Sequence, residues 1–117
     1  VSCDTHFAHK AWHDASEKIT NLPYPMLADP THKVADIFDV YIEEEGVAER
    51  GSFIVNPEGK IVCYEVNAGN IGRNAAELLR RVQASQFVAE HGDSVCPARW
   101  VPGSEVLHPG IDLVGKL

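Results

Sequence analysis

The chain has 117 residues, of which 44% are hydrophobic and 23% are charged, a composition typical of a globular protein and not of a disordered one. Its 10 basic and 17 acidic residues give a formal net charge of -7, which argues against binding nucleic acid, because affinity there comes mainly from clustered Lys and Arg. No run approaches the ~18 apolar residues of a membrane span, and the length allows one domain at most.

The cysteine count points to a reducing compartment. Cys3, Cys63 and Cys96 are widely spaced and form no CxxC pair. An odd count argues against a secreted disulfide framework, so we expect a cytoplasmic protein with reduced thiols. The start, Val1-Ser2-Cys3-Asp4, is not a signal peptide and has no initiator Met, so we expect a processed chain or a part of a longer one.

An amphipathic helix is predicted near the N-terminus, after a strand end at residues 1–3. Asp4 or Thr5 can cap it, and it continues to about Thr20, because apolar residues recur at spacings of three and four. The Pro-containing run at residues 21–25 breaks it. Its apolar face is predicted to carry Phe7, Ala11, Trp12, Ala15 and Ile19.

A short strand and a short helix are predicted next. Met26-Leu27-Ala28 is an apolar strand that Asp29-Pro30 closes, and Thr31 caps the following helix. The acidic run at residues 43–46 is predicted as a solvated turn and not as a metal site. The apolar positions of the short helix are Val34, Ile37 and Phe38.

The clearest β signal is a hairpin. Two β-rich runs, residues 52–56 and 60–66, flank the turn Pro57-Glu58-Gly59. After a Gly-containing loop, Asn74 opens a last helix that continues to about His91. The predicted core face of this helix carries Leu78, Leu79, Val82 and Phe87.

This order of strands and helices is an α/β pattern. It predicts the C-terminal portion of a thioredoxin-like fold with an extended C-terminal tail. We assign residues 1–91 to an incomplete thioredoxin-like domain and residues 92–117 to the tail, where Pro and Gly interrupt any periodicity. A sheet of three or four strands would have an uncovered edge and an incomplete core, so the chain alone should be marginally stable.

Two arginines are candidates for an active site. Arg50 precedes the hairpin and Gly51, so its guanidinium can point into a cleft, where it would lower the pKa of a nearby thiol and donate to developing negative charge. The alternative is a surface ion pair with Glu44 or Glu49. Arg73 lies directly before a predicted helix N-terminus, a position that suits an anion site, and the same two interpretations apply.

The thiols and histidines offer further candidates. Cys96 lies in Pro-rich, non-periodic surroundings, where an accessible thiol suits thiol–disulfide exchange; the alternative is an incidental free cysteine. Cys63 in mid-strand and Cys3 at a strand end are predicted to be structural. His9 and His13, four residues apart on the first helix, suggest a zinc site, but no second ligand cluster follows; otherwise His9 lies near the active face of the domain.

Taken together, these residues resemble the C-terminal part of the typical two-cysteine peroxiredoxins, close to the bacterial alkyl hydroperoxide reductase C type. The resemblance spans nearly the whole chain, and its order of motifs makes it specific. The matching runs are residues 1–13, Tyr24-Pro25-Met26, Asp29-Pro30, Arg50-Gly51-Ser52-Phe53-Ile54-Val55, Asn67, Ile71-Gly72-Arg73, Val95-Cys96-Pro97-Ala98-x-Trp100 and residues 109–116.

The resemblance implies a peroxidase that reduces hydrogen peroxide and organic hydroperoxides without a cofactor. It implies that Cys96 is the resolving cysteine, which forms an intersubunit disulfide with a peroxidatic cysteine in a homodimer; relatives close such dimers into decamers. Arg50 would polarise peroxide and stabilise the peroxidatic thiolate, and Arg73 would lie near the same pocket. Trp12 and Trp100 would be packing residues. A flavoprotein disulfide reductase or a thioredoxin would reopen the disulfide.

One family motif is missing. No stretch of the sequence matches the Pro-x-x-x-Thr-x-x-Cys that carries the peroxidatic cysteine, and Cys3 stands where relatives commonly have a small hydroxyl residue. We therefore expect the 117 residues to be incomplete and inactive alone. The alternative is a non-enzymatic module that dimerises through an edge strand at residues 61–66.

Overall fold

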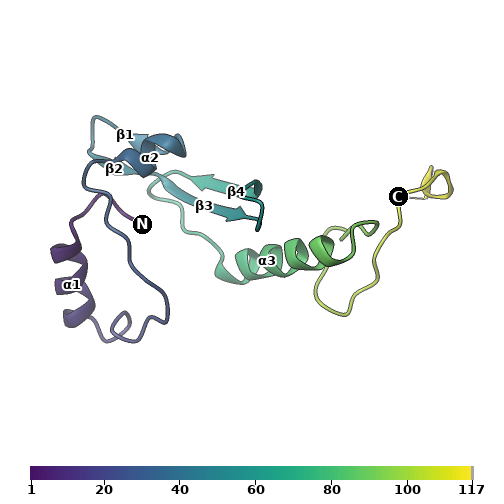
Figure 1. The fold of residues 1–117 in the computed structure, drawn as a ribbon, viewed down its shortest axis with the longest axis horizontal. Coiled ribbons are helices and arrows are strands. Elements are labelled where there is room, and N and C mark those ends of the chain that lie inside the picture. The colour runs from purple at the N-terminus through teal and green to yellow at the C-terminus, as the bar shows by residue number, and fades with distance from the viewer. Residues whose placement is uncertain (117) are drawn as a thin grey trace. The chain divides into compact units, whose positions relative to one another are not determined.

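The computed structural model describes residues 1–116 and contains both helices and strands, as the sequence predicts (Figure 1). Two compact units form, one from Val1–Gly51 and Val66–Gly72, the other from Ser52–Glu65 and the chain from Arg73 onward. The division between residues 91 and 92 stays a prediction. In chain order the elements are α1 (His6–Ala15), α2 (Lys33–Ile37), β1 (Tyr41–Ile42), β2 (Val47–Ala48), β3 (Arg50–Val55), β4 (Ile61–Asn67), α3 (Ala75–Glu90) and the 3₁₀ helix η1 (Ile111–Leu113).

Helix α1 begins where predicted but ends earlier. Thr5 is its N-cap, and the Thr5 hydroxyl accepts from the Ala8 N–H at 3.2 Å. The prediction that the helix reaches Thr20 is wrong, because Ser16 adopts an extended conformation (φ -113°, ψ 113°). The chain then continues in turns, in which the Thr20 N–H still donates to the Ser16 carbonyl at 3.0 Å.

The predicted apolar face of α1 is not buried among the described residues. Phe7 is 74% exposed and Trp12 is 57% exposed, whereas His9 is only 7% exposed. A helix buries its apolar stripe only where another element covers it. The prediction that Trp12 is a packing residue is therefore wrong for residues 1–116.

The strand predicted at residues 26–28 is reduced to a single parallel bridge between Ser2 and Ala28. The Ser2 N–H donates to the Leu27 carbonyl at 3.2 Å, and the Asp29 N–H donates to the Ser2 carbonyl at 2.8 Å. Two bonds suffice to join the N-terminus to this segment, but they are too few to form a ladder.

The N-terminus of α2 differs from the predicted Thr31 cap. His32 is the N-cap residue in a left-handed conformation (φ 49°), and its side chain makes no capping bond. The Asp29 carboxylate, which is 4% exposed, accepts instead from the N–H groups of Val34 at 3.0 Å and Ala35 at 2.9 Å. A buried carboxylate thus satisfies the donors that Thr31 was expected to satisfy.

The acidic run at residues 43–46 forms a turn, as predicted, but the strands on either side of it were missed. β1 and β2 pair antiparallel, with Tyr41 opposite Ala48 and Ile42 opposite Val47. Gly46 adopts φ 69°, and its N–H donates to the Ile42 carbonyl at 2.9 Å. Two-residue strands carry too little periodicity to be recognised in a sequence.

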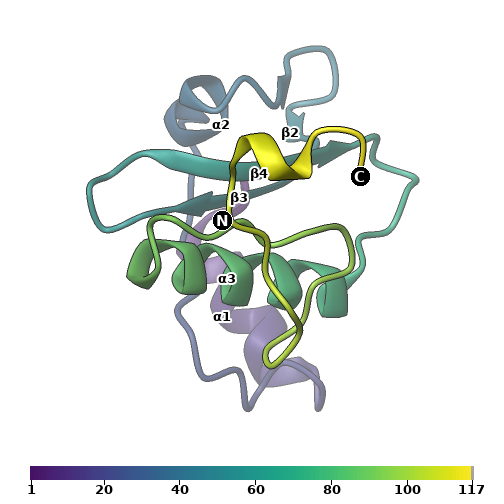
Figure 2. The ribbon, with the colours of Figure 1, turned by 90° about the vertical axis from the view of Figure 1, so that its right-hand side faces the viewer.

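The predicted hairpin is confirmed. β3 and β4 are hydrogen-bonded neighbours, and a connection of five residues can join only antiparallel strands (Figure 2). Gly59 supplies the positive φ of 77° that the turn requires, and the Asn56 N–H donates to the Lys60 carbonyl at 2.9 Å. The predicted sheet of three or four strands is wrong for the described residues, because this sheet has two strands.

Helix α3 confirms the last predicted helix to within one residue at each end. The Asn74 side chain caps it by accepting from the N–H groups of Ala76 at 3.0 Å and Glu77 at 3.2 Å. The predicted core face is wrong for the described residues, since α3 has no buried residue and Leu79 is 57% exposed. Too little of the described chain covers that face.

The hydrophobic core is small, as the sequence predicts. Only Ala35, Val40 and Trp100 are buried apolar residues among those described, and none of these side chains is fully buried. None of the helices within residues 1–116 combines the length and the apolar character that crossing a bilayer requires.

Candidate functional site

Cys96 lies in an irregular segment that is held on both sides. Val95 and Leu107 form an antiparallel bridge, in which each N–H donates to the other residue's carbonyl, at 2.8 and 2.9 Å. On the other side, the N–H of the buried Trp100 donates to the Pro97 carbonyl at 3.0 Å. Cys96 itself is a free, half-buried thiol. The segment therefore presents a thiol between two anchors, outside any helix or strand.

Trp100 is the anchor that ties the segment to helix α3. It is 3% exposed, and its ring lies against Phe87 of α3 with centroids 5.0 Å apart and planes tilted by 46°. The Arg80 guanidinium donates from Nη1 to the Trp100 carbonyl at 3.1 Å. The indole Nε1 finds no hydrogen-bond partner among residues 1–116, and an unpaired buried donor costs about 1–3 kcal/mol.

The residue before this anchor is conformationally strained. Arg99 adopts φ 64°, in the left-handed region that disfavours a residue with a Cβ by about 1–2 kcal/mol. Such a conformation persists only when its surroundings impose it. The buried ring of Trp100 and the Val95–Leu107 bridge lie on either side of Arg99 in the chain, and both restrict the segment that carries Cys96.

One carboxylate of α3 binds two arginines. Glu77 accepts from Arg80 at 2.6 and 2.9 Å and from Nε of Arg81 at 2.9 Å. Arg80 and then Arg81 lower the pKa of Glu77 to about 2. Arg81 also pairs with Glu65 of β4 at 2.9 Å, which ties α3 to the hairpin. The charges on α3 thus hold both the tail and the sheet.

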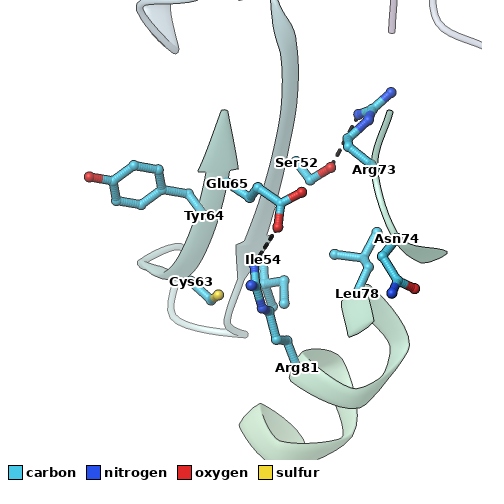
Figure 3. A pocket seen from close by; sticks show the side chains of 9 residues that line it. All are labelled: Ser52, Ile54, Cys63, Tyr64, Glu65, Arg73, Asn74, Leu78 and Arg81. Carbon is cyan, nitrogen blue, oxygen red and sulfur yellow. Dashed lines mark hydrogen bonds and ion pairs between the residues drawn. The ribbon is translucent and has the colours of Figure 1, made fainter. Parts of the chain in front are cut away.

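A small pocket lies between the hairpin and the start of α3 (Figure 3). The Arg73 guanidinium donates from Nη1 to the Ser52 hydroxyl at 3.1 Å, so this predicted site residue does contribute to a pocket. The free thiol of Cys63 is half-buried. The pocket is lined by Ser52, Ile54, Cys63, Tyr64, Glu65, Arg73, Asn74, Leu78 and Arg81.

Arg50 belongs to the other compact unit and is exposed. Its Nε donates to the Gly69 carbonyl oxygen at 2.6 Å, so the loop after β4 fixes one edge of the guanidinium. The ion pairs expected as an alternative, with Glu44 or Glu49, are absent from the described part of the chain. The carbonyl contact orients Arg50 without neutralising it.

The histidines of α1 line an open groove with Lys10. His9 is buried, and its Nε2 lies 2.6 Å from the Ser2 hydroxyl. No group of three or more His, Cys, Asp or Glu within residues 1–116 is arranged to hold a metal ion. The pairing of His9 with His13 as a zinc site therefore receives no support from this part of the chain.

The surroundings of Cys3 disfavour its thiolate form. Burial, followed by the carboxylates of Asp29, Asp4 and Asp36, raises the pKa of the Cys3 thiol. Because the thiolate and not the thiol attacks, a raised pKa suppresses reactivity at neutral pH. This agrees with the interpretation that Cys3 is structural.

Sequence reasoning missed Arg80 and Glu77. Their spacing of three residues on a predicted helix is the signal that could have found the ion pair, because residues three apart lie on the same face. Nothing in the sequence, however, places the tail against that face. The contact of Arg80 with the Trp100 carbonyl forms only when the tail folds back onto α3.

Two protein families match the chain. The AhpC/TSA family matches residues 1–63, and the C-terminal domain of 1-Cys peroxiredoxin matches residues 84–113. The alkyl hydroperoxide reductase C of Staphylococcus epidermidis is 51% identical over 117 residues, which is 100% of this chain and 62% of that protein. The chain therefore spans less than two thirds of the length of this curated relative.

Solved structures agree with these matches. The structure of Enterococcus faecalis AhpC has a TM-score of 0.78 and 59% identity, over 82% of this chain and 57% of that one. The reduced 2-Cys peroxiredoxin of Plasmodium vivax has a TM-score of 0.87 and 28% identity, over 95% of this chain and 58% of that one. The arrangement of the described elements is thus one that longer proteins also contain.

Proposed function

Because the chain belongs to the AhpC/TSA family of peroxiredoxins and has the C-terminal portion of their thioredoxin-like fold, we propose that it supplies the resolving half of a thiol-dependent peroxidase. The substrates would be hydrogen peroxide and organic hydroperoxides. Cys96 would be the resolving cysteine, and Arg50 and Arg73 would be active-site arginines. The observation that carries the proposal is the free, half-buried Cys96 in an irregular segment held at two points.

The proposed cycle begins with a thiolate from the family's Pro-x-x-x-Thr-x-x-Cys motif, which no stretch of residues 1–117 matches. The thiolate attacks one oxygen of the hydroperoxide, so that an S–O bond forms, the O–O bond breaks and the alkoxide leaves and takes up a proton. The sulfur is oxidised to a sulfenic acid, while the hydroperoxide is reduced to an alcohol or to water.

Cys96 acts in the second step. Its thiolate attacks the sulfenic sulfur, an S–S bond forms, and hydroxide leaves and is protonated to water. This exchange requires the Cys96 sulfur to approach in line with the bond that breaks, so the segment must leave at least one of its anchors. A dithiol reductase, a flavoprotein or a thioredoxin, then reduces the disulfide and restores both thiols.

The arginines would act in the first step. A guanidinium stays charged at any physiological pH, lowers the pKa of a nearby thiol and donates to the oxygen that develops negative charge. The Nε of Arg50 is bound to the Gly69 carbonyl, which supports such a role because the side chain is oriented before substrate arrives. Arg73 is held at the Ser52 hydroxyl beside the pocket of Figure 3.

The proposal also covers the oligomeric state and the cellular compartment of the enzyme. A resolving cysteine that acts on a neighbouring subunit requires a homodimer, which family members can close into a decamer. The odd number of cysteines and the lack of a CxxC pair support a reducing compartment such as the cytoplasm.

Substitution of Cys96 tests the assignment. In a polypeptide that joins the family's nucleophile motif to these 117 residues, Cys96→Ser should abolish the peroxide-induced dimer band on a non-reducing gel while the first peroxide reaction survives. Cys63→Ser is the matched control and should keep the band. A band that persists in Cys96→Ser would refute the role of Cys96.

A second candidate is a non-enzymatic dimerising module, which the exposed apolar residues of β4 favour. Its Ile61, Val62, Tyr64 and Val66 are 50%, 49%, 69% and 43% exposed, and β3 is its only strand neighbour within the described residues. Such an edge can pair with a second copy. If so, Val62→Lys should yield monomers in sedimentation velocity at concentrations where Val47→Lys, on β2, still dimerises; equal behaviour of the two variants would contradict it.

A further inference from the structure

Arg80 is the residue of α3 that makes a polar contact with the anchored tail. Its guanidinium donates through Nη1 to the Trp100 carbonyl at 3.1 Å, and its side chain is 24% exposed. The two neighbouring nitrogens, Nε and Nη2, both donate to the Glu77 carboxylate, at 2.6 and 2.9 Å. Glu77 therefore fixes the plane of the guanidinium, and that plane aims the remaining nitrogen at the tail.

The adjacent arginine shows that this contact is specific to Arg80. Arg81 shares the Glu77 carboxylate but directs its Nη1 to Glu65 of β4, at 2.9 Å. The two side chains carry the same charge, lie on the same helix and share Glu77 as a partner. They differ in their second partner. Arg80 holds the tail, and Arg81 holds the hairpin.

The contact acts on Cys96 because few other bonds hold its segment. The segment runs from the Val95–Leu107 bridge to Trp100. The hydrogen bond from the Trp100 N–H to the Pro97 carbonyl joins two residues of this segment, so it does not tie the segment to another element. Arg99 is held at φ 64°. Loss of the Arg80 bond would therefore let the segment relax toward an open form.

We propose that Arg80 is a latch for the Cys96 segment: its guanidinium, oriented by Glu77, holds the Trp100 carbonyl and sets how often the segment opens. Arg80 is a positioning residue, since it acts on the thiol through the backbone of Trp100. The Glu77 carboxylate chiefly raises the pKa of Arg80, so the guanidinium stays charged while it holds the tail.

The latch has a consequence for turnover that rests on the proposed function. If Cys96 is the resolving cysteine, a weaker latch gives a more frequent opening, so the disulfide forms sooner and less sulfenic acid is oxidised further. The holding of the segment by Arg80 does not depend on that role. It can be measured without peroxide and without a second redox thiol.

The test is the rate at which iodoacetamide alkylates each cysteine of the 117-residue chain, read by mass spectrometry of the three cysteine peptides. Because the Cys96 thiol is half-buried, its alkylation becomes faster when the segment opens more often. Arg80→Met keeps the aliphatic stem and removes the donor, so it should raise the Cys96 rate about tenfold, the order expected for one charge-assisted hydrogen bond. Cys63 and Cys3 should change by less than about twofold in the same sample, because neither is held by this bond.

Arg80→Lys separates the effect of the lost hydrogen bond on the opening of the segment from the effect of the lost positive charge. Lysine keeps the positive charge but cannot bind Glu77 with a fork and reach the Trp100 carbonyl at the same time. We therefore expect a rise of about threefold in the Cys96 rate, smaller than that of Arg80→Met. Glu77→Gln should raise the rate in the same direction, because it loosens the orientation of Arg80.

Arg81→Met is the matched control and should leave the Cys96 rate within about twofold of the wild type, because Arg81 does not contact the tail. The latch would be overturned if Arg80→Met and Arg80→Lys both left the Cys96 rate unchanged. It would equally be overturned if Cys63 and Cys3 accelerated in parallel with Cys96, since Arg80 would then serve the stability of the whole unit. A dimer band that persists in Cys96→Ser would refute the proposed function, but it would not affect the alkylation result for Arg80.

Discussion

Truncation of Trp100 should release the tail by an amount that the structure allows us to work out. Replacing a buried Trp by Ala costs about 3–5 kcal/mol. From this about 1–3 kcal/mol is to be subtracted, because the same change removes an indole N–H that is buried without a partner among residues 1–116. At the middle of both ranges the net loss is about 2 kcal/mol, which corresponds to a factor of about 30 in the opening equilibrium.

The assay is amide hydrogen exchange at Val95 and Leu107, whose N–H groups form the bridge beside Cys96. Trp100→Ala should lower the protection of both amides by about 30-fold. Trp100→Phe keeps an aromatic ring against Phe87 and removes the unpaired N–H, so protection should change by less than about fivefold. Trp12→Phe, at a residue that is 57% exposed, is the control and should change nothing.

Two results would refute this reasoning. If Trp100→Phe lowered protection as much as Trp100→Ala, the indole N–H would have a partner that stabilises the tail. If Trp100→Ala left both amides protected, Trp100 would not be the anchor of the segment.

Three further predictions concern the frame around the site. Asp29→Ala should lower the free energy of unfolding in urea by about 1–2 kcal/mol, because Asp29 caps α2; an unchanged midpoint would contradict this. Gly59→Ala should lower it by about 1 kcal/mol, since Gly59 has φ 77°; a neutral effect would exclude strain there. The pKa of Glu77 is lowered from 4.5 to about 2, so its stabilising effect is present above pH 4.5 and lost as pH falls through about 2; the circular dichroism of Glu77→Gln should lack this transition, and identical titrations would contradict it.

Local signals in the sequence found the elements that depend on local chemistry. The Pro-x-Gly turn predicted the β3–β4 hairpin, and Asn74 predicted the start of α3, because a turn and a cap each need particular residues at particular positions. The capping of α2 escaped prediction for the opposite reason. Asp29 lies five and six residues before its partners Val34 and Ala35, too far for a local capping pattern.

Predictions that needed a tertiary partner failed or stayed open. The faces of α1 and α3 have the periodicity of buried faces, yet Phe7 and Leu79 are exposed among the described residues, because periodicity says which side is apolar and not what covers it. The same limit applies to the site. Cys96 stood out by its surroundings, whereas the hold of Arg80 on the tail arises only when a segment 20 residues away in sequence folds back.

The central claim is that Cys96 supplies the second thiol of the cycle, and one measurement tests it most directly. A polypeptide that joins the family's nucleophile motif to these 117 residues would be treated with one equivalent of hydrogen peroxide, digested without reduction and analysed for disulfide-linked peptides. We predict that the peptide of Cys96 is joined to the peptide of the motif cysteine, with Cys3 and Cys63 free. A disulfide that forms without Cys96, or a Cys96 that stays free while peroxide is consumed, would contradict the account.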